Sequence, residues 1–111
     1  MSDWQEMLKA ARRIDALYQA KDIDRIGRPW SLAEFLSQCA PDWGELAEQV
    51  GKHEGFRPGP YDQDAAAHEL GDLLWALIVI SDRMGIDLEE ALMGTMDGLE
   101  DRLNKTGDAY Q

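Results

Sequence analysis

The stretch DAAAHELGDLLWALIVISDRM, residues 64–84, decides the fold class. Its centre, LLWALIVI at residues 73–80, is apolar throughout, and such a run alone is compatible with a buried strand or a buried helix. The helical spacing of apolar residues continues on both sides, and the whole stretch is too long for a strand. We therefore predict a helix over residues 64–84, closed by Gly85. The apolar run is also far too short to cross a bilayer.

Two segments before this stretch also have helical signals. Residues 3–20 place apolar side chains at spacings of three and four, which is typical of an amphipathic helix. Ser31, with Glu34 three positions later, has the pattern of a capping box and predicts a second helix over residues 31–50. Gly51 is expected to end that helix in a left-handed turn.

The remaining signals complete a helical fold. Pro41 lies inside the second predicted helix, so we expect a kink or a break there. Residues 51–61 are rich in Gly and Pro and predict a loop. Asp87 and Glu90 form a further capping pair, which predicts the start of a fourth amphipathic helix. The sequence thus predicts an all-α protein, a four-helix bundle formed by a single domain over residues 1–111.

Composition and charge restrict the classes of function. A hydrophobic fraction of 44% indicates a folded domain rather than a disordered chain. The N-terminal residues do not resemble a secretory signal, and the single Cys39 cannot close an intramolecular disulfide, so we expect a soluble cytoplasmic protein. The net charge of -11 argues against a nucleic-acid duplex or an anionic membrane as partner. A polyanionic substrate needs metal ions or a local basic patch to approach.

Acidic residues three positions apart are common in a chain with 22 Asp and Glu, so their position relative to the apolar face is the better criterion. At about 100° per residue, Asp42 and Glu45 lie on the flank of the apolar stripe of the second predicted helix. Glu69 and Asp72 lie at the corresponding place on the third helix. If these helices pack together, the four carboxylates converge, and their repulsion requires a bound cation. Ligand sets made only of oxygen favour Mg²⁺ or Mn²⁺ over zinc.

The third predicted helix is apolar on more than one side. Trp75 and His68 lie opposite its main stripe and are expected to pack against another helix or another subunit. This extra apolar face, together with four Trp residues in a short chain, predicts an oligomer. The main stripe itself, which is expected to face the core, consists of Leu70, Leu73, Leu74, Leu77 and Met84.

Two motifs are similar to those of a known family. DWGEL at residues 42–46 and HELGDLLW at residues 68–75 resemble the signature of the MazG-like all-α nucleotide pyrophosphohydrolases, in which an ExxE motif is followed, after a variable gap, by ExxD. The likeness continues through MGIDLE at residues 84–89 into the fourth predicted helix. It therefore covers roughly residues 30–103.

The resemblance implies an activity and a set of site residues. Such proteins are helical bundles that form homodimers or homotetramers and use Mg²⁺, or Mn²⁺, to hydrolyse a (deoxy)nucleoside triphosphate to the monophosphate and pyrophosphate. A house-cleaning role on damaged nucleotides fits this activity. By this resemblance Glu45, Glu69 and Asp72 are the catalytic residues, with the general base unassigned. The metal-ligand positions fall on Asp42, Glu45, Glu69 and Asp72.

The chain departs from the family pattern at several positions. Asp42 stands where the signature has Glu, which shortens the reach by one methylene, and Pro41 precedes it. Family members often hold phosphates with Asn and Lys on the last helix, where this chain has Thr95 and Gly98. One alternative is therefore a catalytically impaired MazG-like module that acts as a nucleotide sensor or protein-interaction partner. A plain acidic bundle with structural carboxylates is the other, and it predicts no metal dependence.

Four residues are candidates to contact the nucleotide. Lys52 and Arg57 place positive charge in the loop between the two acidic helices, where a triphosphate needs it, although Lys52 also suits a helix C-terminus. Arg102 is the candidate phosphate contact on the fourth helix, and it too suits a helix end. Trp30 is a candidate to stack on the base, although it also suits a hydrophobic staple at the second helix.

Overall fold

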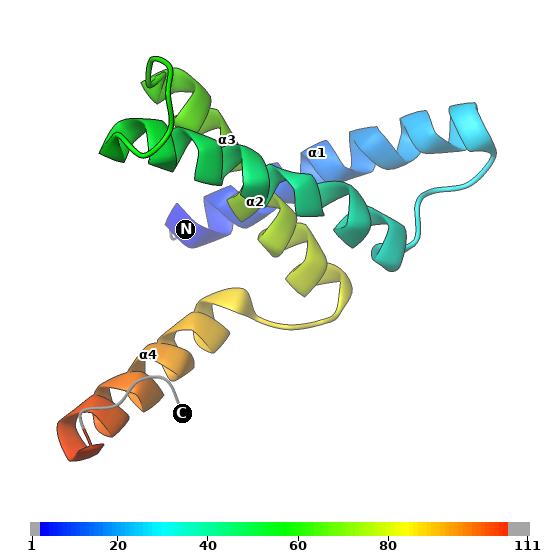
Figure 1. Ribbon diagram of the computed structural model, residues 1–111. Coiled ribbons are helices and arrows are strands. Elements are labelled where there is room, and N and C mark those ends of the chain that lie inside the picture. The colour runs from blue at the N-terminus through cyan, green and yellow to red at the C-terminus, as the bar shows by residue number, and fades with distance from the viewer. Residues whose placement is uncertain (1–2, 107–111) are drawn as a thin grey trace. The chain divides into compact units, whose positions relative to one another are not determined.

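The computed structural model describes residues 3–106, which form four helices and no strand (Figure 1). This confirms the all-α class and the helical interpretation of the apolar run; residues 1–2 and 107–111 of the predicted domain lie outside the described part. The chain divides into two compact units, Met1–Ile80 and Ser81–Gln111, and each is described by itself. The helices are α1 (Asp3–Ile26), α2 (Leu32–Glu54), α3 (Gln63–Arg83) and α4 (Leu88–Thr106).

Helix α1 is longer than the sequence pattern predicts. It continues past residue 20 to Ile26, so the predicted end was wrong. Gly27 ends the helix with a φ of 81°, and its N–H donates to the carbonyl of Ile23 at 2.9 Å. The turn that the prediction omitted is mostly polar, and Ile23 in it is half-exposed, so weak amphipathicity obscured a true helix.

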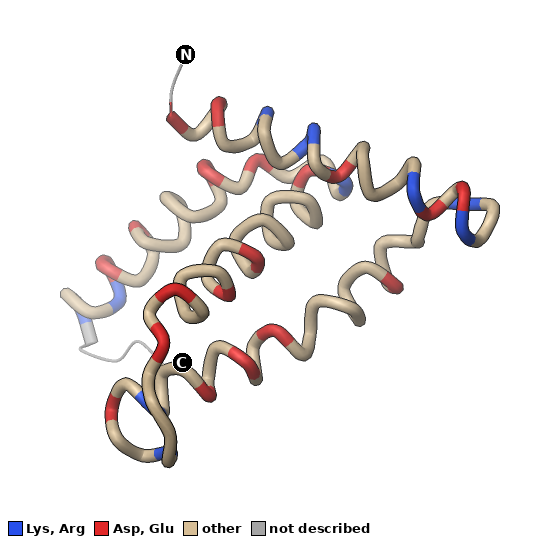
Figure 2. The backbone as a smooth tube through the Cα atoms, turned by 90° about the horizontal axis from the view of Figure 1, so that it is seen from above, with Lys and Arg blue, Asp and Glu red and all other residues tan. Residues whose placement is uncertain are grey.

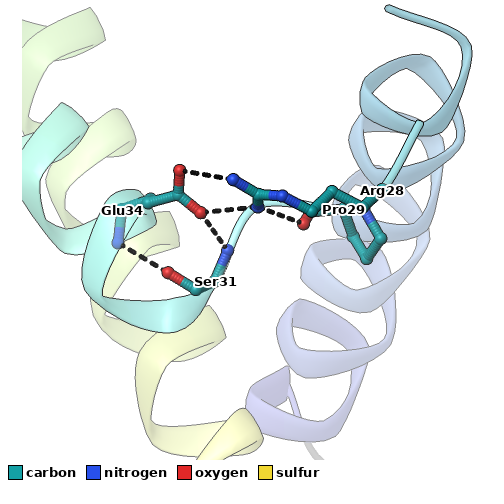
Figure 3. Close-up of polar contacts among 4 residues, drawn as sticks. All are labelled: Arg28, Pro29, Ser31 and Glu34. Atoms are coloured by element: carbon teal, nitrogen blue, oxygen red, sulfur yellow. Dashed lines mark hydrogen bonds and ion pairs between the residues drawn. The ribbon is translucent and has the colours of Figure 1, made fainter. Parts of the chain in front are cut away.

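The start of α2 confirms the predicted capping box. The backbone N–H of Glu34 donates to the Ser31 hydroxyl at 3.2 Å, and the N–H of Ser31 donates to Glu34 Oε1 at 2.8 Å. Arg28 adds a bidentate ion pair to the same carboxylate at 2.8 and 3.1 Å (Figure 3). Its guanidinium also donates to the carbonyl of Pro29, so the connection between α1 and α2 is fixed by one polar network.

The rest of α2 corrects the predicted break at Pro41 and the predicted helix end at residue 50. The helix runs unbroken through Pro41, whose missing N–H leaves the carbonyl of Ser37 without its donor on an exposed face that water reaches. It also continues through Gly51 to Glu54, so the predicted end at residue 50 was wrong. The left-handed position is Gly55, with a φ of 83°, and its N–H bonds back to the carbonyls of Gly51 and Lys52. The loop is correspondingly shorter than predicted.

Helix α3 supplies most of the core of the first unit. Trp75 anchors it by contacting two other helices: its ring lies 5.6 Å from that of Tyr18 on α1 and 5.4 Å from that of Phe35 on α2. Its indole N–H donates to the carbonyl of Ala11 at 3.2 Å. The expectation that Trp75 packs against another helix is therefore confirmed. Buried apolar side chains are Ala11, Ala66, Leu73, Ala76, Ile78 and Val79.

The main stripe predicted for α3 is mostly not core. Of its members only Leu73 is buried, while Leu70, Leu74, Leu77 and Met84 are 44–58% exposed. When a helix is apolar on several sides, the periodicity of its sequence does not show which side is buried. In α3 the side that packs is the one with the small residues Ala66 and Ala76.

The second unit contains α4 and the turn before it. Gly85 has a φ of 72° and closes the turn after α3, as predicted. Asp87 caps α4 by accepting a hydrogen bond from the N–H of Glu90 at 3.0 Å, which confirms the predicted start. None of the four described helices is both long and apolar enough to span a membrane.

Candidate metal centre

Three carboxylates from two helices come together in the first unit. Asp42 lies on α2, and Glu69 and Asp72 lie one turn apart on α3. One carboxylate oxygen of each lies within 4.8 Å of the corresponding oxygens of the other two, and all three side chains are partly buried. The structure therefore brings together three of the four carboxylates that the helical-wheel argument selected.

The packing of α3 on α2 explains this convergence. Trp75 lies close to one helical turn after Asp72, and its edge-to-face contact with Phe35 holds α3 against α2. The buried Ala66 and Ala76 allow α3 to pack closely on its neighbours on either side of Glu69 and Asp72. Pro41 does not displace Asp42, because the helix is continuous there.

The surroundings of Glu69 disfavour its negative charge. Its pKa is raised because burial disfavours the charged form, because it hydrogen-bonds with Glu45, and because the charges of Glu45, Asp42 and Asp72 repel its own. Its Oε2 atom is shielded from solvent and has no hydrogen-bond partner among the described residues. A buried carboxylate oxygen without a partner is unfavourable and requires an explanation.

Asp42 and Glu45 are two further carboxylates whose charges interact with that of Glu69. The pKa of Asp42 is raised by burial first and then by the charges of Glu45 and Asp72, while His68 acts in the opposite direction. Glu45 is exposed and is not one of the three carboxylates whose oxygens converge. It is nevertheless a close neighbour of Glu69, as the hydrogen bond between them shows.

The residues present fit a hard divalent cation. They offer only carboxylate oxygens, which suit Mg²⁺, Mn²⁺ or Ca²⁺. The partnerless Oε2 of Glu69 is the donor atom that such an ion would satisfy. Positive charge there would also relieve the repulsion that raises the pKa values of Glu69 and Asp42.

Two residues beside the carboxylates were not predicted to be there. Cys39 lies one turn before Asp42, and its pKa is raised by burial and by the charges of Asp42 and Asp72. His68, expected to pack on a second helix or subunit, is exposed and lies 3.1 Å from Asp72. The sequence signal that could have placed them there is spacing: Cys39 lies three positions before Asp42, and His68 lies four positions before Asp72.

The basic candidates on α2 and its loop have partners of their own. Lys52 lies in the last turn of α2 and pairs with Glu48 at 3.4 Å, which supports its alternative role at a helix C-terminus. Arg57 folds back across Gly51 so closely that a Cβ there would lie 2.9 Å from its Cγ. It lines a surface hollow together with Trp43 and other residues of α2 and the loop. The structure does not place these two cations among the carboxylates.

Trp30 belongs to the first unit and Arg102 to the second. Trp30 precedes the cap of α2 and lines a hollow with Ala33, Glu34, Ser37 and Gln38. Arg102 is a partly buried residue of α4 in the second unit. Among the helices, α1 carries the most Lys and Arg (Figure 2). The acidic residues of the candidate centre lie on α2 and α3.

Comparison with known proteins gives one match. A family model described as the MazG nucleotide pyrophosphohydrolase domain matches residues 33–106, which is well over half of the chain. The matched region includes all four carboxylates and excludes Trp30. Neither a curated protein nor a solved structure matches the chain.

Proposed function

The chain belongs to the MazG nucleotide pyrophosphohydrolase family, and on that premise we propose that it hydrolyses a (deoxy)nucleoside triphosphate to the monophosphate and pyrophosphate with a bound Mg²⁺ or Mn²⁺ ion. The observation that carries this proposal is the partnerless, solvent-shielded Oε2 of Glu69 within a group of three carboxylates. Each oxygen of a purely structural carboxylate is expected to be paired or solvated, and among the described residues Oε2 of Glu69 is neither. Damaged nucleotides are the substrates we expect for a house-cleaning enzyme.

Asp42, Glu69 and Asp72 are proposed to hold the cation. When bound, such an ion polarises a phosphoryl oxygen and helps to activate a water molecule. Glu45 lies outside the three converging oxygens yet beside Glu69, so it is the carboxylate left to accept a proton from the attacking water.

The net charge of -11 opposes the approach of an anionic substrate. A triphosphate is repelled by such a chain unless positive charge offsets the repulsion locally. We propose that Lys52, Arg57 and Arg102 contribute this charge and that Trp30 contacts the base. Of these, Lys52 has to exchange its pairing with Glu48 for a phosphate.

We further propose that the protein acts as a homo-oligomer, a dimer or tetramer. Leu70, Leu74 and Leu77 are 56%, 44% and 45% exposed on a single chain, and a partner copy that covers them removes apolar surface from water. Sedimentation should give a mass that is a multiple of 12.5 kDa, and Leu74→Asp should shift it towards the monomer. A monomeric wild type would contradict this assembly.

The test of the activity is a panel of nucleoside triphosphates with Mg²⁺ or Mn²⁺, in which monophosphate and pyrophosphate are both measured. Glu69→Gln removes one charge at nearly constant size and is expected to abolish turnover. Glu6→Gln makes the same chemical change at an exposed position of α1 and should leave turnover intact. Nucleotide binding without turnover by the wild type would favour the catalytically impaired sensor instead, and activity without added metal would contradict the proposed chemistry.

A further inference from the structure

His68 lies at the outer edge of the carboxylate group. Its Nε2 is 3.1 Å from Asp72 Oδ2, and the two residues are four positions apart on α3, so they share one face of that helix. The His68 side chain is 71% exposed, whereas that of Asp72 is 45% exposed. The imidazole is therefore the more exposed partner of the pair, and Asp72 is the less exposed one.

The ring of His68 also acts on Asp42, a second carboxylate of the group. His68 lowers the pKa of Asp42, against the effects of burial and of the neighbouring carboxylates, so the ring acts on a carboxylate of α2 as well as on Asp72 of its own helix. Among the described residues, His68 is the group that lowers the pKa of Asp42. His68 thus differs from a solvated surface residue that interacts only within its own helix.

From this geometry we propose that His68 positions Asp72, by donating from Nε2 to Oδ2 and so leaving the other carboxylate oxygen to face a cation held by Asp42 and Glu69. This inference rests on the metal centre of the proposed function. Carboxylates that ligate metals are themselves commonly oriented by hydrogen bonds from outer residues, and loss of such a residue typically weakens metal binding about 10–100-fold. The role requires a hydrogen-bond donor at this position, which either a neutral or a charged ring supplies.

A second pair in the chain has nearly the same local geometry and serves as a control. Lys105 Nζ lies 3.1 Å from Asp101 Oδ2, the residues are again four apart on a helix, and the Lys105 side chain is also 71% exposed. Asp101 does not belong to the group of converging carboxylates. If pairing of this kind affected metal binding only through helix stability, the loss of either pair would have the same effect.

The experiment is a titration of the full chain with Mn²⁺ alone, without nucleotide, for the wild type and the variants His68→Ala, His68→Gln and Lys105→Ala. Gln retains an N–H donor without the positive charge. We expect Mn²⁺ affinity to fall about 10-fold or more in His68→Ala. It should stay within about 3-fold of wild type in His68→Gln and be unchanged in Lys105→Ala. Circular dichroism should show equal helix content in all four proteins.

The other outcomes overturn the inference in distinguishable ways. Unchanged or tighter Mn²⁺ binding by His68→Ala would show that the ring merely neutralises Asp72 in the absence of metal. Equal weakening in His68→Ala and His68→Gln would contradict a hydrogen-bonding role. A wild type that binds no Mn²⁺ would overturn the metal centre itself, and the positioning role with it.

Discussion

Glu34 and Glu69 are both glutamates on helices of the same unit, yet their surroundings are opposite. Glu34 is bonded by Arg28 and by the backbone of Ser31, and these partners lower its pKa from 4.5 to about 2. Glu69 is partly buried among other carboxylates, its pKa is raised, and Oε2 has no partner among the described residues. The protein can satisfy a carboxylate fully where it serves the fold, and it does not do so at Glu69.

This difference between Glu34 and Glu69 distinguishes a carboxylate that stabilises the fold from one that is available to bind a metal ion. Neutralising Glu34 removes a favourable interaction from the folded state, so we assign it to stability. Neutralising Glu69 removes a repulsion, so the charge of Glu69 opposes folding until a cation balances it. Changes at the cap should therefore affect stability alone, and changes at the carboxylate group should affect metal binding.

The largest effect is expected at Asp42. Asp42→Asn removes a charged ligand at constant size, and Mn²⁺ affinity should fall by at least about 100-fold, the upper range for loss of an outer residue. Calorimetric titration measures this. Asp42→Glu restores the residue of the family signature, but it should bind Mn²⁺ no more tightly, because an Asp42 oxygen already lies within 4.8 Å of the others. Tighter binding by Asp42→Glu would show that the aspartate is too short.

A smaller effect is expected at the cap of α2. Ser31→Ala removes the acceptor for the N–H of Glu34 and should lower the free energy of unfolding by about 1 kcal/mol. Urea denaturation followed by circular dichroism measures this loss. The increase in stability caused by Mn²⁺ should be the same as in the wild type. A reduced Mn²⁺ effect in this variant would mean that the cap and the carboxylate group are coupled.

The smallest effect is the pH dependence that comes from Glu34. Because its pKa is lower in the folded state, its contribution to stability is fully present above about pH 4.5 and is lost as pH falls towards 2. The pair with Arg28 is exposed, which keeps this contribution modest. Urea denaturation from pH 7 to pH 2 should show a shallower acid-side decline for Glu34→Gln. Identical pH profiles would contradict the assignment of Glu34 to stability.

Local sequence signals predicted the helix starts correctly. Ser31 with Glu34, and Asp87 before Glu90, act through contacts between residues three apart, so the surroundings hardly matter. Helix ends were predicted less accurately than helix starts. Gly51 and Gly55 are both compatible with a left-handed turn, and only the bonds from Gly55 and the residues after it to the carbonyl of Gly51 decide between them.

The site was predictable in part, for a related reason. Helical spacing and the resemblance to the family selected Asp42, Glu69 and Asp72, which the structure brings together. The same spacing argument placed Leu70 and Leu77 in the core, where they are not, because the buried side of an apolar helix depends on its tertiary partners. The sequence did not predict that His68 lies beside the carboxylate group, because its effect on Asp42 depends on the packing of α3 against α2.

Thermal unfolding of Glu69→Gln and Glu34→Gln, with and without Mn²⁺, tests the contrast between these carboxylates most directly. At an Mn²⁺ concentration about 100 times the dissociation constant, the wild type should gain about 2.7 kcal/mol of stability. Glu69→Gln should melt at or above the wild-type temperature without metal and gain almost nothing from Mn²⁺, whereas Glu34→Gln should melt lower and keep the full gain. A full Mn²⁺ gain in Glu69→Gln, or none in the wild type, would contradict a metal centre at Glu69.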